Sequence, residues 1–222
     1  MEYEKLLELV GDVPVFESSL LLAGKVNPEN IRLQLTRWTK SGRVYQLRRG
    51  LYAIAPPYQK VKPHPFVIAN HLQRASYVSL QTALAFYGMI PETIQSTVSV
   101  TSGRPEQLST PLGSFEFRHV KSELLRGYRM TDLRGQQALV ATPEKALLDL
   151  IYLQPEGDSL VYLRELRLQN FEQLDLDHLS ALSKVFNTPK MLRAIENITH
   201  LVQSAAQEYE TLPPSLREGM YQ

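Results

Sequence analysis

The chain has 222 residues, of which 43% are hydrophobic and 21% charged, so it can fold around one large core or two small ones and is not intrinsically disordered. Cysteine is absent and no apolar run of about 18 residues occurs, which excludes disulfides, thiolate catalysis and membrane spans and favours a cytoplasmic location. The formal net charge is only +1, but residues 25–62 carry nine lysines and arginines against a single acid, Glu29.

Two short helices are expected at the start of the chain. Apolar side chains recur at helical spacing between Tyr3 and Val10, which predicts a helix from about residue 2 to residue 10. A second short helix fits residues 17–23, just before the basic segment.

The third predicted helix runs from Pro28 to about Ser41 and carries most of the basic charge. Asn27 suits its N-cap, and proline suits the first helical position because its missing N–H needs no partner there. Gly42 ends the helix. The apolar face that we expect to pack on the first two helices consists of Ile31, Leu35 and Trp38. The other sides of the helix carry Asn30, Arg32, Leu33, Gln34, Thr36, Arg37 and Lys40.

Most of the outward side chains of this helix are of the types that read DNA. Arginine donates a pair of hydrogen bonds to guanine, and asparagine or glutamine forms a similar pair with adenine. Lysine and the remaining arginines suit phosphate. Leu33 does not fit a polar reading face, and the sequence leaves two roles open: contact with a thymine methyl group, or packing under the next element.

A basic hairpin is expected directly after this helix. Residues 44–47 and 51–54 alternate as strands do, and Gly50 between them supplies the positive φ that a tight turn needs. Helices followed by such a hairpin are the parts of a winged helix-turn-helix, which binds double-stranded DNA. The residues that we predict to bind DNA are Asn30, Arg32, Gln34, Arg37, Lys40, Arg43, Arg48 and Arg49. The alternative is a protein-interaction module with an exposed basic hairpin.

The sequence predicts an α+β protein of two domains. Four prolines between residues 55 and 65 favour an extended linker, because proline removes backbone donors and disfavours helix in the residue before it. The predicted domains are a winged helix-turn-helix of residues 1–57, a proline-rich linker of residues 58–65, and an α/β domain of residues 66–222 that ends in helices.

The second domain is expected to mix strands with helices. Runs of β-type residues predict strands at 97–101, 114–120 and 137–141, and one around 128–130. Periodic apolar residues predict helices at 66–74, 79–87, 142–153, 159–168, 177–186 and 189–206. Ser79 and Thr142 suit N-caps, and Pro143 suits the first turn after Thr142. The inward side chains expected in the last helix are Leu192, Ile195, Thr199 and Val202.

Three segments of the chain together resemble one known family. The first is Leu47-Arg48-Arg49-Gly50-Leu51-Tyr52, an Arg-Gly-x-Tyr wing with Gly50 and Tyr52 as its motif residues. The second spans residues 77–91, from Tyr-Val-Ser-Leu-Gln-Thr-Ala-Leu to Tyr-Gly-Met-Ile-Pro. The third, residues 141–149, is Ala-Thr-Pro-Glu-Lys-Ala-Leu-Leu-Asp and contains Pro143 and Asp149. Over about residues 1–155 the chain resembles the AbiEi-type antitoxins of type IV toxin–antitoxin (abortive infection) systems.

The resemblance implies a two-part regulator without a cofactor and without enzymatic activity of its own. The N-terminal winged helix would repress its own operon by binding inverted repeats. The second domain would counteract a nucleotidyltransferase toxin, a functional partner with which no tight complex is expected, and so contribute to phage defence. No family motif assigns antitoxin residues in this sequence.

The sequence supports an enzymatic function less well than it supports DNA binding. A nucleotidyltransferase needs Gly-Ser close to paired acids, but Gly113-Ser114 and Asp175-Leu176-Asp177 lie about sixty residues apart. A metal-dependent nuclease-like domain with vestigial DNA binding remains an alternative. The acids and lysine that support it are Glu116, Asp132, Glu144, Lys145 and Asp149. Asp149 interrupts an apolar helix, so we expect it to be paired or at an interface. No two histidines have the sequence spacing of metal ligands, so no metal site is predicted.

Overall fold

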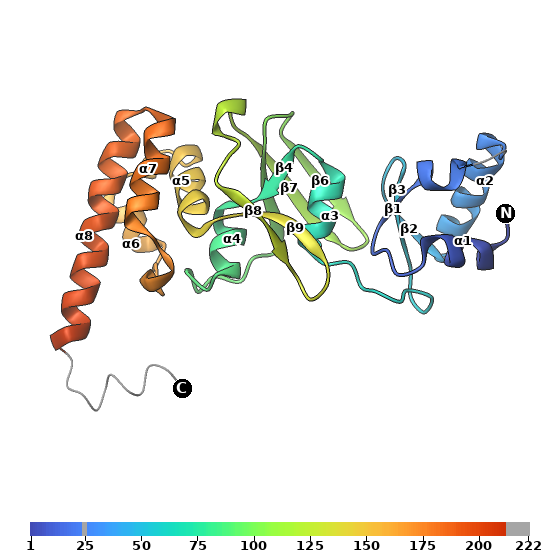
Figure 1. Cartoon of the computed structure of the whole chain (residues 1–222), viewed down its shortest axis with the longest axis horizontal. Coiled ribbons are helices and arrows are strands. Elements are labelled where there is room, and N and C mark those ends of the chain that lie inside the picture. Colours follow the sequence, from blue (N-terminus) through green and yellow to red (C-terminus); the bar gives the residue numbers. More distant parts are fainter. Residues whose placement is uncertain (24–25, 212–222) are drawn as a thin grey trace. The chain divides into compact units, whose positions relative to one another are not determined.

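The computed structural model describes residues 1–23 and 26–211 and is a mixed α+β protein with 46% helix and 21% strand (Figure 1). The predicted α+β class is therefore confirmed. Two compact units divide the chain. The first comprises Met1–Val78, Gln95–Ser122 and Tyr128–Val140, and the second comprises Ser79–Ile94, Glu123–Gly127 and the chain from Ala141 onward. Within the described residues, no helix combines the length and apolarity that crossing a bilayer requires.

The first unit begins with a small module of helices and short strands, which we call the N-terminal module. Its elements are α1 (Tyr3–Val10), β1 (Phe16–Glu17), η1 (Ser18–Leu22), α2 (Pro28–Lys40), β2 (Val44–Arg48) and β3 (Leu51–Ile54). The expected second helix is a single 3₁₀ segment, η1, rather than an α-helix. The side chains that form its core are Tyr3, Leu6, Val10, Phe16, Leu21, Ile31, Leu35, Trp38, Val44, Tyr52 and Ile54. The three apolar residues predicted to anchor α2 are thus buried.

Local chemistry sets both ends of α2. The Oδ1 atom of Asn27 accepts a hydrogen bond from the backbone N–H of Glu29 at 2.9 Å, and Pro28 occupies the first turn, as predicted. At the other end Gly42 has a φ of +71°, and the N–H of Arg43 donates to the carbonyl of Trp38 at 2.9 Å. This is a Schellman ending, which needs a left-handed residue at the glycine position.

The three strands of the N-terminal module pair in the order β1-β3-β2. The register shifts inside β2, since Gln46 pairs with Tyr52 and Arg48 with Leu51, leaving Leu47 as an extra residue. This bulge breaks the expected alternation of residues 44–47: Leu47 is buried and Arg48 is exposed. Every residue of β3 is buried because β3 is the central strand.

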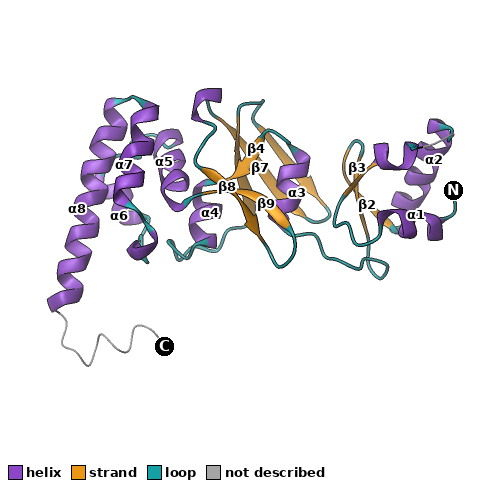
Figure 2. Ribbon diagram, viewed as in Figure 1, coloured by secondary structure: helices purple, strands orange, loops and turns teal. Residues whose placement is uncertain are grey.

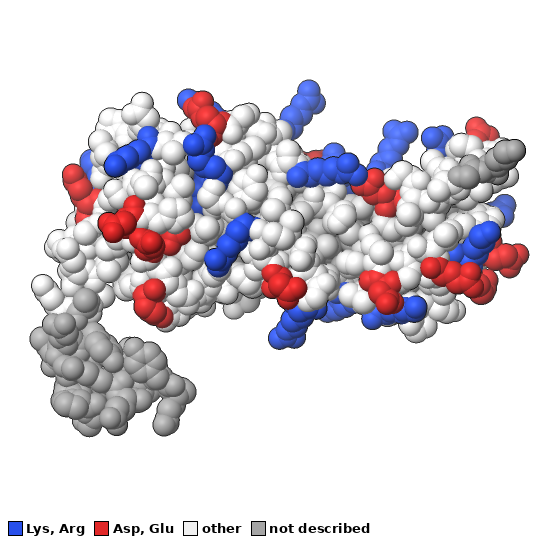
Figure 3. Space-filling model, in the orientation of Figure 1, with Lys and Arg blue, Asp and Glu red and all other residues white. Residues whose placement is uncertain are grey.

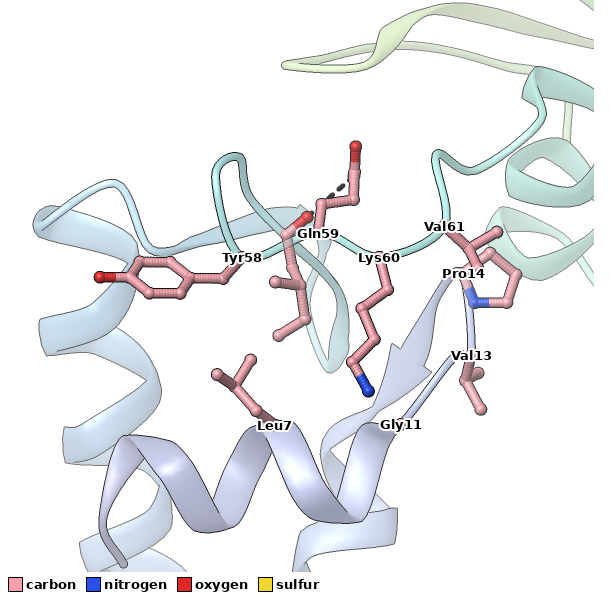
Figure 4. Close-up of a pocket in the computed structure, with 9 residues that line it drawn as sticks. Leu7, Gly11, Val13, Pro14, Tyr58, Gln59, Lys60 and Val61 are labelled. Atoms are coloured by element: carbon pink, nitrogen blue, oxygen red, sulfur yellow. Dashed lines mark hydrogen bonds between the residues drawn. The ribbon is translucent and has the colours of Figure 1, made fainter.

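The proline-rich segment folds back on the N-terminal module instead of forming a free extended spacer. The Tyr58 ring meets the Tyr3 ring edge to face with centroids 5.2 Å apart, and Gln59 Nε2 donates to the carbonyl of Ile54 at 2.9 Å. Lys60 Nζ lies 3.5 Å from a carboxylate oxygen of Asp12. Figure 4 shows this segment above α1, around a hollow of about 30 Å³ that has room for no more than a few water molecules.

The rest of the first unit is a six-stranded sheet with the order β6-β7-β5-β4-β9-β8 (Figure 2). Its strands are β4 (Ser76–Val78), β5 (Ser96–Thr101), β6 (Glu106–Thr110), β7 (Gly113–His119), β8 (Tyr128–Asp132) and β9 (Gln137–Ala141). Strands β4 and β6 were not predicted. Helix α3 (Pro65–Leu72) contacts β4 and β5, and its five buried residues are Phe66, Val67, Ile68, Ala69 and Leu72.

The second unit is helical. It holds α4 (Leu80–Phe86), α5 (Pro143–Leu153), α6 (Leu160–Glu165), η3 (Phe171–Gln173), α7 (Leu176–Phe186) and α8 (Pro189–Thr211). The short turn η2 (Ser122–Leu124) lies where the chain passes from the first unit to the second. Helix α5 contacts α4, α7 and α8, and its first nine residues are buried. The predicted inward face of α8 is wrong by one position. Met191, Ala194 and Ile198 are buried, whereas Leu192 is 63% exposed.

Candidate nucleic-acid interface

The outer face of α2 presents polar and basic side chains from a rigid helix. Asn30, Arg32, Arg37 and Lys40 are all exposed. The helix beneath them is held by Ile31, Leu35 and Trp38, and the Trp38 ring packs edge to face on the Tyr3 ring at 5.5 Å. Trp38 is therefore a core residue and is not available to stack on a base.

Two other residues of α2 differ in their exposure. Leu33 is 56% exposed, so the alternative in which it packs under the hairpin is wrong. Gln34 is half-buried, and its Oε1 atom is buried without a hydrogen-bond partner among the described residues. The carbonyl oxygen of Gln34 therefore faces the protein, and only part of this side chain is accessible from solvent.

Arg43 contacts α1 rather than standing free beside α2. Its guanidinium lies 5.1 Å from the centre of the Tyr3 ring, and the Tyr3 hydroxyl donates to the Arg43 carbonyl at 3.0 Å. Burial raises the pKa of Tyr3, with a smaller contribution in the same direction from Tyr58. These contacts join the first helix to the start of the hairpin.

The two arginines at the end of the hairpin have different surroundings. Arg48 Nη1 donates to the carbonyl of Leu72 at 2.8 Å and lies 3.4 Å from a carboxylate oxygen of Glu106. Arg49 is exposed in the turn beside Gly50, whose φ of +83° confirms the predicted positive value. Arg49 is therefore exposed in the hairpin turn, while the Nη1 atom of Arg48 is already bonded within the first unit.

Charges of both signs are mixed on one face of the N-terminal module. On the face drawn in Figure 3, acidic and basic side chains lie side by side over the N-terminal module. On this face, an anionic ligand would depend on individual basic side chains and not on a broad positive field.

The other motif residues stabilise the fold. Tyr52 stacks on Phe16 with ring centroids 5.8 Å apart. Pro143 lies in the first turn of α5, where Thr142 Oγ1 accepts a hydrogen bond from the N–H of Lys145 at 3.3 Å, as the predicted cap requires.

Asp149 belongs to a buried charged cluster in the second unit. Its Oδ1 atom accepts from Lys145 Nζ, one helical turn earlier, and its Oδ2 atom accepts from Ser79 Oγ at 2.8 Å. Lys145 and Asp149 are 1% and 0% exposed. Burial lowers the pKa of Lys145, and the adjacent carboxylate of Asp149 opposes that shift. The expectation that Asp149 is paired is confirmed. The expected N-cap role of Ser79 is wrong, because its hydroxyl bonds to Asp149 and makes no cap hydrogen bond.

The remaining acids that favoured a nuclease have separate partners. Glu116 pairs with Arg118 at 3.0 Å, and Asp132 accepts a hydrogen bond from the N–H of Gly135 at 3.2 Å. Glu144 accepts from the N–H of Asp175 at 3.0 Å. In the part of the chain that the structure describes, no three His, Asp or Glu side chains gather as a metal site requires.

No protein-family model matches the sequence, and no curated protein is significantly similar to it.

Proposed function

We propose that this chain is a DNA-binding transcriptional autorepressor whose N-terminal module is a winged helix-turn-helix. The order of α1, η1 and α2 followed by the β2–β3 hairpin supports this, since α2 then has the place of the recognition helix. The observation that carries the proposal is that Asn30, Arg32, Arg37 and Lys40 are all exposed around the outer side of a helix that is fixed by its buried face. Arg49 in the turn supplies a contact to the DNA backbone.

We also propose that the protein acts as a type IV antitoxin in the cytoplasm. The support is the resemblance of the wing, of residues 77–91 and of residues 141–149 to the AbiEi-type family. The partner would be a nucleotidyltransferase toxin encoded beside this gene. Growth of cells that express that neighbour should recover when this chain is co-expressed, and no recovery with a folded chain would contradict the antitoxin role.

Binding to the protein's own promoter tests the repressor role most directly. The purified chain should retard a promoter duplex that holds an inverted repeat, and affinity should fall steeply between about 50 and 200 mM salt, since lysine and arginine contacts release counterions. A scrambled duplex of equal length is the control for sequence preference. Equal affinity for both duplexes, or no salt dependence, would contradict sequence-specific repression.

Leu33 gives a test that separates stability from recognition. Leu33→Ala should change the free energy of unfolding by less than about 0.5 kcal/mol, because the side chain is mostly exposed. If it contacts a thymine methyl group, the variant should also lose part of its preference for thymine over uracil at one operator position. Binding measured on matched thymine and uracil duplexes checks this, and an unchanged preference would assign Leu33 no role in base contact.

One observation favours protein binding as a second candidate function. Leu9, Val13 and Leu20 on the N-terminal module are 49%, 50% and 44% exposed, so the module offers apolar side chains that a protein partner could cover. A promoter duplex that is not retarded, together with a stable partner lost on Leu9→Ser and Leu20→Ser, would favour this function.

A further inference from the structure

A polar hollow lies in the first unit beside the hairpin turn. It measures about 330 Å³, at the lower end of the roughly 300–1,000 Å³ that ligand sites occupy. Its walls come from η1 with the residue before it, from the hairpin turn and from the end of α3 with the residues after it. The lining residues are Glu17, Ser18, Ser19, Arg48, Arg49, Gly50, Leu51, His71 and Arg74. Leu51 is the sole aliphatic side chain among them, so the hollow is not built for an apolar ligand.

The hollow already binds one oxyanion, the carboxylate of Glu17. Arg74 Nη2 donates to its Oε1 atom, and Ser19 Oγ donates to its Oε2 atom at 3.2 Å. The hydrogen bond from Arg74 holds the pKa of Glu17 below its usual value, which keeps the carboxylate ionised. A guanidinium and a hydroxyl converging on one carboxylate form the donor arrangement that also suits a phosphate group.

Two further arginines, Arg48 and Arg49, line the same hollow. The N–H of Ser18 donates to the carbonyl of Gly50 at 2.8 Å, which fixes the two serines against the hairpin turn. Arg48 is oriented by the Leu72 carbonyl and by Glu106, so little side-chain entropy remains to be lost when it binds a ligand. Arg49 lines the same hollow and is exposed.

We propose that this hollow is a phosphate site, in which the ligand's phosphate displaces the Glu17 carboxylate from Arg74 and Ser19. Three guanidinium groups then face a group that carries more negative charge than the carboxylate it replaces. The phosphate comes either from a small phosphorylated molecule or from the backbone of the bound DNA. The second source rests on the proposed DNA-binding function, and the first does not.

The test uses two variants whose effects have opposite signs. Glu17→Gln removes the competing charge and should tighten phosphate binding several-fold, whereas Arg74→Gln removes a donor and should weaken it at least tenfold. A role limited to folding would not make one variant bind better than the parent chain. The matched control is the exposed Glu116–Arg118 pair of the sheet, changed by Glu116→Gln and Arg118→Gln.

The first arm of the test titrates the full chain with inorganic phosphate at constant ionic strength by calorimetry. Saturable binding that follows the expected order of the two variants assigns the hollow to a small phosphorylated ligand. The second arm measures affinity for the promoter duplex against salt. A salt slope that falls by about one in Arg74→Gln, with tighter binding by Glu17→Gln, assigns the hollow to the DNA backbone.

The proposal is overturned if neither arm separates the two variants, or if the control pair changes binding as much as they do. A parent chain that retards no duplex would defeat the proposed repressor function alone. The phosphate titration alone would then decide whether the hollow binds phosphate.

Discussion

Asp149→Ala should lower the free energy of unfolding by about 3–5 kcal/mol, the largest effect expected in the second unit. The substitution leaves the ammonium group of Lys145 buried without its counter-ion and removes the acceptor of the Ser79 hydroxyl. Desolvation of an unpaired charge costs more than the loss of the hydrogen bonds themselves. Urea unfolding followed by circular dichroism, with both units monitored, measures this effect.

Two further variants separate the burial of charge from the loss of packing. Lys145→Met combined with Asp149→Leu should recover most of the stability lost in Asp149→Ala, because apolar side chains of similar size need no counter-ion there. Arg118→Ala, which breaks an exposed pair, should change stability by less than about 1 kcal/mol. If Asp149→Ala unfolds at the same urea concentration as the parent chain, the buried pair has no structural role.

Replacing Arg37 and Lys40 together by alanine should weaken binding to the promoter duplex by about 100-fold or more, the largest functional effect expected. A bidentate arginine–guanine contact is worth about 1–3 kcal/mol, and loss of a phosphate contact reduces the salt slope by about one. Both side chains are exposed, so the melting temperature should stay close to that of the parent chain.

The control removes the same charge elsewhere. Lys5 lies on α1, and Lys60 lies beside Asp12, just after the end of α1. Both side chains are exposed and neither belongs to α2. Their double alanine variant should lose only the general electrostatic part of the affinity, with sequence preference intact. If the two double variants lose affinity equally and alike on every sequence, α2 does not read bases.

Elements governed by local chemistry were predicted well. Asn27 and Pro28 at the start of α2 and Gly42 after its end were readable because caps and stops depend on a few neighbouring residues. Thr142 and Pro143 defined the start of α5 for the same reason. The apolar face of α2 followed from helical periodicity alone.

Elements governed by distant partners were missed. Strand β1 has two residues and β4 has three, so their existence depends on pairing with β3, β5 and β9 rather than on a pattern of their own. Ser79 was read as a cap because its partner Asp149 lies seventy residues away. In α8 the apolar residues are spread around the helix, so periodicity misplaced the inward face by one residue.

The candidate site shows the same division. The exposed residues of α2 were predicted, since a helix with one buried face must present the other. The engagement of Arg48 by Leu72 and Glu106 had no signal in the sequence, because Arg48 and Arg49 are identical in type and adjacent. The polar hollow was likewise unpredictable, since its lining comes from three separate stretches of chain.

The bulge at Leu47 makes the residue count of β2 matter as well as its composition. Side chains alternate between the two faces of a strand. Deletion of Leu47 would place Arg48 directly after Gln46 and turn the Arg48 side chain toward the core. Relatives of this protein should therefore keep the residue count of β2 and apolar residues at the positions of Val44 and Leu47. Gaps in an alignment should fall outside this strand.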